Sequence, residues 1–457
     1  MTAFAGDVFR AYDIRGVVGK DFDESWVERL GLAVGAHFRK HGLGRAVVGR
    51  DVRPSSESFE SALAKGLLSA GVDVILLGEV PTPVFYFAAL QLNTRAGVVV
   101  TASHNPPQYN GFKIWRGPTT IHGEEIQQIR RIFETGPTPA GAPGLLSRHD
   151  ILPAYYDDAL SEIRLRNPVK VVLDGGNGVA GPVCLELLRR AGADVVPLYC
   201  DPDGRFPNHH PDPMVEANLA ALKDKVLAEG AHLGVAMDGD GDRLGAVDET
   251  GAFMAADRLL ALFARDVLEE RPGAQIIGDV KCTQLLFDDI ETHGGKAIMA
   301  ATGHSLMKAK ILETGAPLAG ELSGHLFFND RHHGYDDAAY AALRLVEILA
   351  KDPARPLSGR LADWPATAAT PEQRIHCPDA IKFKVVQIVR DRLAEDRPVV
   401  DIDGVRAVFP DGWGLLRASN TEPDLVLRFE ASSKEGACAI KKTVMEALNE
   451  ALRKIGG

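Results

Sequence analysis

The chain has 457 residues, 45% of them hydrophobic and 25% charged; these values are typical of globular proteins, and the length predicts three or four domains. The net charge of −11 argues against nucleic acid as a partner, and no apolar run reaches the roughly 18 residues that span a membrane. The start of the chain lacks the layout of a signal peptide. The five cysteines are scattered and never spaced as C-x-x-C, so we expect no disulfide framework, no zinc site and a cytoplasmic location.

The first unit, residues 1–149, alternates strand and helix signals. Near its start, Tyr12 and Arg15 lie in FRAYDIRGVVG, which by itself fits an exposed edge strand. The expected strands are 46–48, 72–77 and 98–100, and the expected helices are 24–39, 58–69, 86–91 and 124–133. This alternation predicts a mostly parallel sheet with helices on both faces. The stretch 136–144, rich in glycine and proline, has the composition of a linker.

A polar loop follows strand 98–100 in the sequence TASHNPPQYNGFK. Two prolines prevent the strand from continuing, so Ser103 lies at a strand's carboxyl end, where open α/β sheets place their ligands. Ser103 is the best candidate nucleophile in the chain, with His104 beside it and Lys113 downstream. The alternative is an ordinary turn, in which serine and asparagine are common.

The second unit, residues 150–251, opens with a strand at 169–173, the turn DGGNGVAG and a helix at 182–190. This turn matches the outline of a dinucleotide-binding fingerprint, formed by Gly176, Gly178, Gly181 and Asp194. Glycines at such a turn also allow a helix to pack closely on a sheet. We favour packing, because the pattern lies mid-chain and stronger phosphate-binding signals occur elsewhere.

Three aspartates alternate with glycines in DGDGDR, between expected strands at 233–237 and 244–247. Residues two apart in an extended loop point the same way, so we expect Asp238, Asp240 and Asp242 to converge. Their mutual repulsion predicts a bound cation, and ligation by carboxylate oxygens selects a hard ion such as Mg²⁺.

Arg243 follows the aspartates and suits a phosphate or a carboxylate. One alternative for the loop is a solvated hairpin tip. Another is an EF-hand calcium loop, because Glu249 stands at the distance of its last ligand. However, Arg243 occupies the position where that loop needs glycine, and the flanking segments have the pattern of strands rather than helices.

The third unit, residues 252–366, again has polar groups after its strands. Helices are expected at 257–268 and 340–349, and strands at 275–280, 296–300 and 316–319. A lone histidine is more often structural, but a neighbouring serine and glutamate on a glycine-bounded loop favour a site. The candidate binding residues after these strands are Lys281, His304, Glu321, Ser323 and His325.

The fourth unit, residues 367–457, has a mixed pattern that predicts an α+β domain. Its expected elements are helices at 382–394 and 434–453, and strands at 399–402 and 407–409, with two more around the loop RASNTEP. A guanidinium, hydroxyls and an amide on one loop can converge on a phosphate, although a plain hairpin loop is the alternative. These candidates are Arg417, Ser419, Asn420 and Thr421, with Arg428 on the following strand.

The segments TASHNPPQYNGFK, DGDGDR, GELSGH and RASNTEP, in this order, resemble the α-D-phosphohexomutase superfamily, and GELSGH is most similar to its phosphomannomutase/phosphoglucomutase branch. The resemblance implies three topologically similar mixed α/β domains and a C-terminal α+β domain around a central cleft. It implies phosphoryl transfer between the 1- and 6-positions of a hexose, mannose or glucose, with Mg²⁺ and a hexose 1,6-bisphosphate intermediate.

The resemblance also assigns roles to residues. Ser103 becomes a phosphoserine, and Mg²⁺ binds the three aspartates and an oxygen of that phosphate. The loop 321–325 reads the sugar, with Lys113 and His325 as candidates for proton transfer, and the loop 417–421 holds the phosphate that is not reacting. The remaining residues that would line the cleft are Tyr12, Arg15, Lys113, Arg243, Lys281, His304 and Arg428. His332 and His333 fill a loop that is often aromatic in relatives.

Several other functions compete with this one. A Ser/His acyl hydrolase would use Ser103, but the chain lacks a G-x-S-x-G elbow there and the aspartates would have no use. A non-catalytic protein that binds sugar phosphates or calcium would need no nucleophile. Phosphoglucosamine mutase is the nearest relative in function, but its GGEQSGH-like loop is absent. We expect sugar phosphates as the only partners and a monomer, with a dimer as the alternative.

Overall fold

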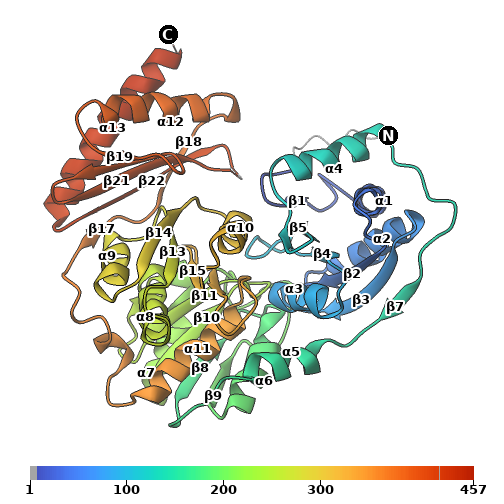
Figure 1. Cartoon of the computed structure of the whole chain (residues 1–457), viewed down its shortest axis with the longest axis horizontal. Coiled ribbons are helices and arrows are strands. Elements are labelled where there is room, and N and C mark those ends of the chain that lie inside the picture. Colours follow the sequence, from blue (N-terminus) through green and yellow to red (C-terminus); the bar gives the residue numbers. More distant parts are fainter. Residues whose placement is uncertain (1–7, 421, 457) are drawn as a thin grey trace.

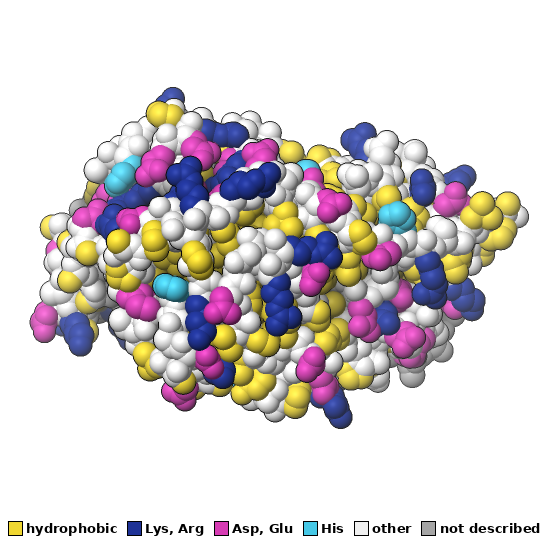
Figure 2. All heavy atoms as spheres, turned by 90° about the horizontal axis from the view of Figure 1, so that it is seen from below, with side chains coloured by type: hydrophobic (Ala, Val, Ile, Leu, Met, Phe, Trp, Pro, Cys, Tyr) yellow, Lys and Arg dark blue, Asp and Glu magenta, His cyan; other side chains and the backbone are white. Residues whose placement is uncertain are grey.

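The computed structural model describes residues 8–420 and 422–456. Four units follow one another along the chain, each built on its own sheet (Figure 1). Three are mixed α/β units and the fourth is an α+β unit, so the predicted fold class is confirmed. Within the described part, none of the helices combines the length and the apolar character needed to span a bilayer. On the face drawn in Figure 2, acidic and basic side chains are interspersed.

The first domain contains a seven-stranded sheet. Its strands are β1 (Ile14–Val17), β2 (Arg45–Arg50), β3 (Asp73–Glu79), β4 (Ala96–Val100), β5 (Tyr109–Arg116), β6 (Thr119–Thr120) and β7 (Leu146–Arg148). Its helices are α1 (Glu24–Lys40), α2 (Ser56–Ser69), α3 (Thr82–Gln91) and α4 (Glu124–Thr135). Helix α1 begins where the Asp23 carboxylate accepts the Trp26 N–H, a typical N-cap. The strand order is β1-β5-β4-β2-β3-β7.

The second and third domains have smaller sheets. The second contains α5 (Leu152–Leu160), β8 (Lys170–Asp174), α6 (Ala180–Ala191), β9 (Asp194–Leu198), η1 (Glu216–Leu219), α7 (Ala220–Glu229), β10 (Leu233–Met237), β11 (Leu244–Asp248) and β12 (Phe253–Met254). The third contains α8 (Ala256–Glu270), β13 (Gln275–Asp279), α9 (Gln284–Thr292), β14 (Lys296–Ala300), α10 (His304–Thr314), β15 (Leu318–Gly320), β16 (Leu326–Phe328), α11 (Ala338–Lys351) and η2 (Leu357–Gly359).

The three α/β sheets share one strand arrangement. The orders β5-β4-β2-β3, β11-β10-β8-β9 and β16-β15-β13-β14 correspond strand for strand. In each, three parallel strands are followed by an antiparallel one. The loop that enters this antiparallel strand carries Ser103 in the first domain, the aspartates in the second and Glu321 in the third. The same topological position therefore supplies the candidate chemistry three times.

The fourth domain packs two helices on an antiparallel sheet. Its elements are β17 (Ala368–Ala369), β18 (Gln373–His376), α12 (Asp379–Ala394), β19 (Val399–Val400), β20 (Val405–Phe409), β21 (Gly412–Ala418), β22 (Asp424–Ala431) and α13 (Lys434–Gly456). Buried apolar residues of α12 and α13, among them Val385, Val389 and Val444, form its core with the sheet. Its predicted α+β character is confirmed.

Some local predictions are wrong. The first sheet is mixed rather than mostly parallel, because β5 forms directly after the two prolines and pairs antiparallel with β4. Strand β7 extends this sheet beyond the predicted linker at 136–144. Helix α10, which begins at His304, is not among the helices expected from the sequence.

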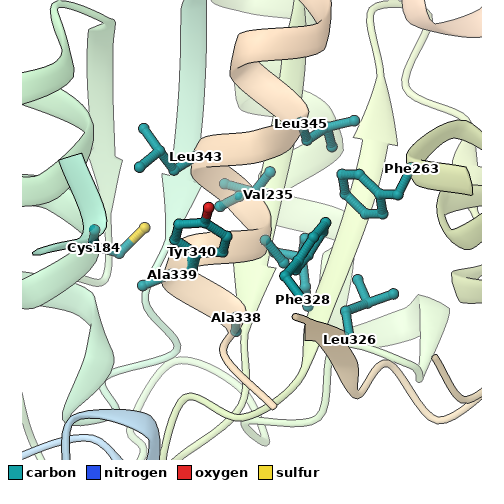
Figure 3. Close-up of a cluster of buried hydrophobic side chains, with 14 of the residues drawn as sticks. Cys184, Val235, Phe263, Leu326, Phe328, Ala338, Ala339, Tyr340, Leu343 and Leu345 are labelled. Atoms are coloured by element: carbon teal, nitrogen blue, oxygen red, sulfur yellow. The ribbon is translucent and has the colours of Figure 1, made fainter. Parts of the chain in front are cut away.

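The second and third domains share a hydrophobic core that also takes in residues of the first, and Figure 3 shows a part of it. Cys184 of the second domain lies on one side of α11, and Phe263 and Phe328 of the third lie on the other. Because α11 belongs to the third domain but buries residues against both sheets, the two domains hold their polar loops in a fixed relation.

Candidate active site

The Ser103 loop is held in a tight, buried turn after β4. Ser103 is 2% exposed and has a φ of +50°, a left-handed conformation that is uncommon outside glycine. Its N–H donates to Thr101 Oγ1 at 2.9 Å, and its hydroxyl donates to Asp238 Oδ2 at 2.6 Å. The candidate nucleophile of the first domain therefore contacts the acidic loop of the second.

The three aspartates converge, as predicted. One carboxylate oxygen from each lies within 4.8 Å of the others, and all three residues are buried. The predicted reason is wrong, however, because the loop is a turn rather than extended. Gly241 has a φ of +77°, and Asp238 Oδ1 accepts the N–H groups of Gly241, Asp242 and Arg243 at 3.0 to 3.2 Å.

Lys113, on β5, is the buried counter-charge of this cluster. Its ammonium donates to Asp240 Oδ2 at 2.7 Å and to Asp242 Oδ2 at 2.5 Å. Burial alone would lower the pKa of Lys113, but the two carboxylates outweigh it and raise this pKa. Burial and the other two carboxylates raise the pKa of Asp238 well above its ordinary value. Without an added cation, the three carboxylates are therefore not all ionised together.

The acidic cluster fits a metal ion. Among the described residues, Asp240 Oδ1 and Asp242 Oδ1 are buried without a hydrogen-bond partner, although His325 Nε2 lies 3.4 Å from the latter. Buried carboxylate oxygens of this kind are the ligands that hard divalent ions take. The residues that would hold the ion are Asp238, Asp240 and Asp242.

The Glu321 loop of the third domain lies against Arg243. His325 Nδ1 lies 2.9 Å from Glu321 Oε2 and 3.1 Å from Ser323 Oγ, while Arg243 Nε lies 3.2 Å from His325 Nε2. Burial would lower the pKa of His325, but Asp242 and Glu321 outweigh it and raise the pKa to about 9. The predicted sugar-reading residues and Arg243 are thus brought together.

His304 lies behind this loop with a neutral ring. Its Nδ1 is 3.0 Å from the ammonium of Lys308, which donates to Asp336 Oδ1 at 2.7 Å. Burial and Lys308 lower the pKa of His304 well below its ordinary value. The His304 and His325 rings lie 5.8 Å apart. Asp336 Oδ2 also lies 4.0 Å from His325 Nε2, so Lys308 and Asp336 connect the two candidate histidines, although the sequence did not single them out.

The fourth domain reaches the first through the RASNTEP loop. Asn420 Nδ2 donates to Tyr12 OH at 2.6 Å, and Tyr12 OH donates to the Thr302 carbonyl at 3.1 Å. Burial and Asp403 raise the pKa of Tyr12 to about 12, so it remains a hydroxyl. Arg417 Nε donates to Asp403 Oδ2 at 2.9 Å. Thr421, the last predicted residue of this loop, lies outside the described residues.

Contacts thus connect the candidate loops of all four domains. Comparison with known proteins identifies the same four units. Family models of phosphoglucomutase/phosphomannomutase match the chain as α/β/α domain I at residues 6–139, domain II at 153–251, domain III at 255–367 and the C-terminal domain at 372–447. The chain belongs to the phosphoglucomutase/phosphomannomutase family. It is therefore an enzyme of the isomerase class that moves a phosphoryl group within a hexose phosphate.

Relatives support this membership along almost the whole chain. A phosphomannomutase/phosphoglucomutase from Pseudomonas aeruginosa is 47% identical over 435 residues, which cover 95% of this chain and 94% of that protein. A phosphoglucomutase from Neisseria gonorrhoeae is 43% identical, with 95% of each chain covered. A crystal structure of a family protein from Burkholderia thailandensis matches with a TM-score of 0.91, 45% identity and 97% of each chain covered.

Other predicted residues lie at the edges of this family site. His104 Nδ1 lies 3.3 Å from Ser103 Oγ. The Arg15 guanidinium donates a hydrogen bond to the side-chain oxygen of Asn105 in the same loop. Lys281 and Arg428 lie further out, near the junction of the third and fourth domains. Their nearest acidic partners are Glu372, 3.6 Å from the Lys281 ammonium, and Asp257, 3.6 Å from the Arg428 guanidinium.

Two competing interpretations of the second domain can be judged. The glycine turn packs against the aspartate loop, since a Cβ added to Gly178 would lie 2.8 Å from the Gly239 carbonyl oxygen. This supports close packing rather than dinucleotide binding. The EF-hand interpretation is wrong, because strands β10 and β11 flank the loop and the Glu249 carboxylate accepts hydrogen bonds from Ser358.

Arg53 is the most informative residue that the sequence did not reveal. Its guanidinium donates to the carbonyls of Ser103, Asn105, Pro106 and Tyr109 at 2.6 to 3.1 Å, and to Asp51 at 3.0 Å. Arg53 thereby fixes the turn that presents the nucleophile. The sequence did contain a signal for Arg53. Asp51 and Arg53 come directly after the apolar strand β2, just as the Ser103 loop comes after β4.

Proposed function

We propose that the chain interconverts the 1- and 6-phosphates of mannose and glucose through a phosphoserine at Ser103 and a hexose 1,6-bisphosphate intermediate. The observation that carries the proposal is the 2.6 Å contact between the Ser103 hydroxyl and Asp238, in a buried cluster of three carboxylates. An ordinary serine turn needs no such acidic neighbours. The names of the relatives, phosphomannomutase/phosphoglucomutase and phosphoglucomutase, support the two sugars.

We further propose Mg²⁺ as the ion held by Asp238, Asp240 and Asp242. When bound, Mg²⁺ offsets phosphate charge and polarises the phosphorus for attack. The ligands offered are all carboxylate oxygens, which favour this hard ion over softer metals. The five free cysteines support a reducing compartment and hence a cytoplasmic location.

In the proposed reaction, a hydroxyl of the sugar attacks the phosphorus of phospho-Ser103. A new P–O bond forms to the sugar as its hydroxyl gives up a proton, the bond from phosphorus to Ser103 Oγ breaks, and Oγ takes up a proton in return. Lys113 and His325 hold protons near this centre, because neighbouring carboxylates raise the pKa of each. Phosphoryl transfer depends mainly on positioning and charge stabilisation, which Lys113 and Arg243 supply.

The bisphosphate then turns around, so that its other phosphate returns to Ser103. The loop of the fourth domain must hold either phosphate in turn, and Arg417 suits this task because guanidinium groups bind phosphate in bidentate fashion. The Tyr12–Asn420 contact supports closure of this domain over the first. Closure excludes water, which would otherwise hydrolyse the phosphoserine.

The test is a Ser103→Ala variant assayed with mannose 1-phosphate, glucose 1-phosphate and glucosamine 1-phosphate. We expect turnover to fall by several orders of magnitude, as for other nucleophiles, and intact-mass spectra to lose one phosphoryl group seen in the wild type after exposure to substrate. Ser61→Ala, on the exposed face of α2, is the control. Near-normal turnover of Ser103→Ala would remove Ser103 from its role, and a preference for glucosamine 1-phosphate would overturn the sugar assignment.

A further inference from the structure

A second group of metal-binding side chains lies outside the family site. It consists of His332 and His333, on the loop between β16 and α11, and Asp158, on α5 of the second domain. His333 Nε2 lies 2.9 Å from Asp158 Oδ2, and His332 Nδ1 lies 3.9 Å from the same oxygen. One ligand atom from each residue lies within 4.8 Å of the others.

The His332 ring is fixed with its Nδ1 free to bind an ion. The Asp337 carboxylate accepts hydrogen bonds from Tyr155 OH and the Tyr340 N–H. His332 Nε2 lies 3.1 Å from the same carboxylate, which acts as an acceptor, so Nε2 is the donor of this bond. In the tautomer that donates this bond from Nε2, Nδ1 offers its lone pair to an ion. A carboxylate that orients a histidine in this way is typical of metal ligands.

The lone pair of His332 Nδ1 is otherwise unsatisfied. The side chain of His332 is fully buried, and among the described residues Nδ1 has no hydrogen-bond partner. It points toward the Asp158 carboxylate, which is also an acceptor, at a distance too long for a hydrogen bond. A buried acceptor without a partner is unfavourable, and a cation between His332 Nδ1 and the Asp158 carboxylate would satisfy it.

We propose that His332 Nδ1, His333 Nε2 and Asp158 form a binding site for a divalent transition-metal ion of the zinc class. Metal–ligand distances of about 2.0–2.2 Å give a tetrahedral edge of roughly 3.4 Å, and the two distances to Asp158 Oδ2 bracket this value. Two imidazoles and one carboxylate select zinc over magnesium. His333 is exposed, so water can take the fourth position and the ion has a path from solvent.

Such an ion would connect two domains. Asp158 belongs to α5, whereas the histidine loop continues directly into Asp336 and Asp337. Asp336 accepts the hydrogen bond of Lys308 beside the active centre, and Asp337 caps α11. The ion would therefore stabilise the join between the second and third domains. The scattered cysteines predicted no zinc site, and this one uses none of them.

The test uses the full-length protein, stripped of metal with a chelator and then kept in excess Mg²⁺ so that the acidic cluster is occupied. Zinc chloride is titrated against a chromophoric chelator, and thermal unfolding is followed in parallel. Cobalt(II) serves as a second probe, because tetrahedral cobalt with nitrogen ligands absorbs strongly in the visible range. The variants are His333→Ala and Asp158→Asn, whose side chains are 38% and 35% exposed and can be replaced without disturbing the core.

We expect the wild type to bind one zinc ion that raises its melting temperature. Each variant should bind zinc at least about tenfold more weakly, the scale on which changes around metal sites act. His376→Ala is the matched control, since His376 is also exposed and lies 3.7 Å from an aspartate, and it should bind zinc as the wild type does. The proposal is overturned if the wild type binds no zinc in excess Mg²⁺, or if the variants and the control retain equal affinity.

Discussion

Replacing Arg53 should disable the enzyme without touching any reacting atom. All five of its N–H groups are used, four on carbonyls of the loop that carries Ser103 and one on Asp51. The residue is 2% exposed, so water cannot readily replace it. Ser103 adopts a left-handed conformation, which costs roughly 1–3 kcal/mol. The loop therefore depends on the hydrogen bonds of the Arg53 guanidinium to keep its shape.

The size of the effect follows from the number of bonds lost. Leaving a buried acceptor without a partner costs about 1–3 kcal/mol, so four carbonyls at the lower value give about 4 kcal/mol for Arg53→Met. Arg53→Lys keeps the charge and offers at most three donors from one atom, so it leaves at least two of the five acceptors unpaired and costs about 2 kcal/mol. A shift of about 1 Å at the nucleophile lowers kcat on the order of 100-fold.

The assay measures kcat, the melting temperature and the mass of the phosphorylated protein for both variants. Arg205→Gln is the control, because Arg205 forms an exposed ion pair with Asp203 that contributes little. We expect kcat to fall on the order of 100-fold for Arg53→Lys and further for Arg53→Met, with lower melting temperatures for both. If Arg53→Lys kept the kcat and melting temperature of the control, the guanidinium hydrogen bonds would not be what positions Ser103.

Three further predictions concern domain closure, acid stability and the metal. Asn420→Ala should lower kcat/KM about fivefold, because a lost hydrogen bond of about 1 kcal/mol weakens closure onto Tyr12; an unchanged value would show that closure does not need this contact. Burial would raise the pKa of Glu125, but hydrogen bonds from His37 and Arg116 lower it from 4.5 to about 2. Its stabilising effect is therefore present above pH 4.5 and lost as the pH falls toward 2, so the melting temperature of Glu125→Gln should lie below that of the wild type at neutral pH and converge with it in acid; a constant difference would contradict this. Chelation should abolish turnover and Mg²⁺ restore it, and turnover that resists chelation would exclude the acidic cluster as a metal site.

The fold could be predicted wherever the signal was local. The apolar run at 296–300 became strand β14 (Lys296–Ala300), and the helical spacing at 24–39 became α1. Strand β5 was missed, because it follows two prolines and contains Asn-Gly, which normally indicate a turn. Strand β7 was missed because its three residues are exposed and leave no hydrophobic pattern. Both strands are stabilised by pairing with a strand that is distant in the sequence, β5 with β1 and β7 with β3.

The residues predicted the site as separate loops, and the resemblance brought Ser103 and the three aspartates together; the other contacts between the loops were not predicted. Ser103, the three aspartates and Glu321 each stand out because polar residues follow an apolar strand. Arg53 and Lys308 do not, since a buried cation in a sequence looks like an exposed one until its partners are known. Asp336 was missed because a buried acid also looks like an exposed one in the sequence, although it accepts a hydrogen bond from Lys308 in the same buried network.

The charges around Ser103 explain why the phosphate and the metal belong together. The three carboxylates face the basic side chains of Lys113, Arg243 and His325, in a buried region where an uncompensated charge is costly. A phosphate on Ser103 alone would add a charge of about −1.5 to −2, and a divalent cation alone would add the opposite charge. Added together, the phosphate and the cation leave the net charge of the site almost unchanged. Each therefore stabilises the other, and the short contact from Ser103 to Asp238 puts the serine where this mutual stabilisation is strongest.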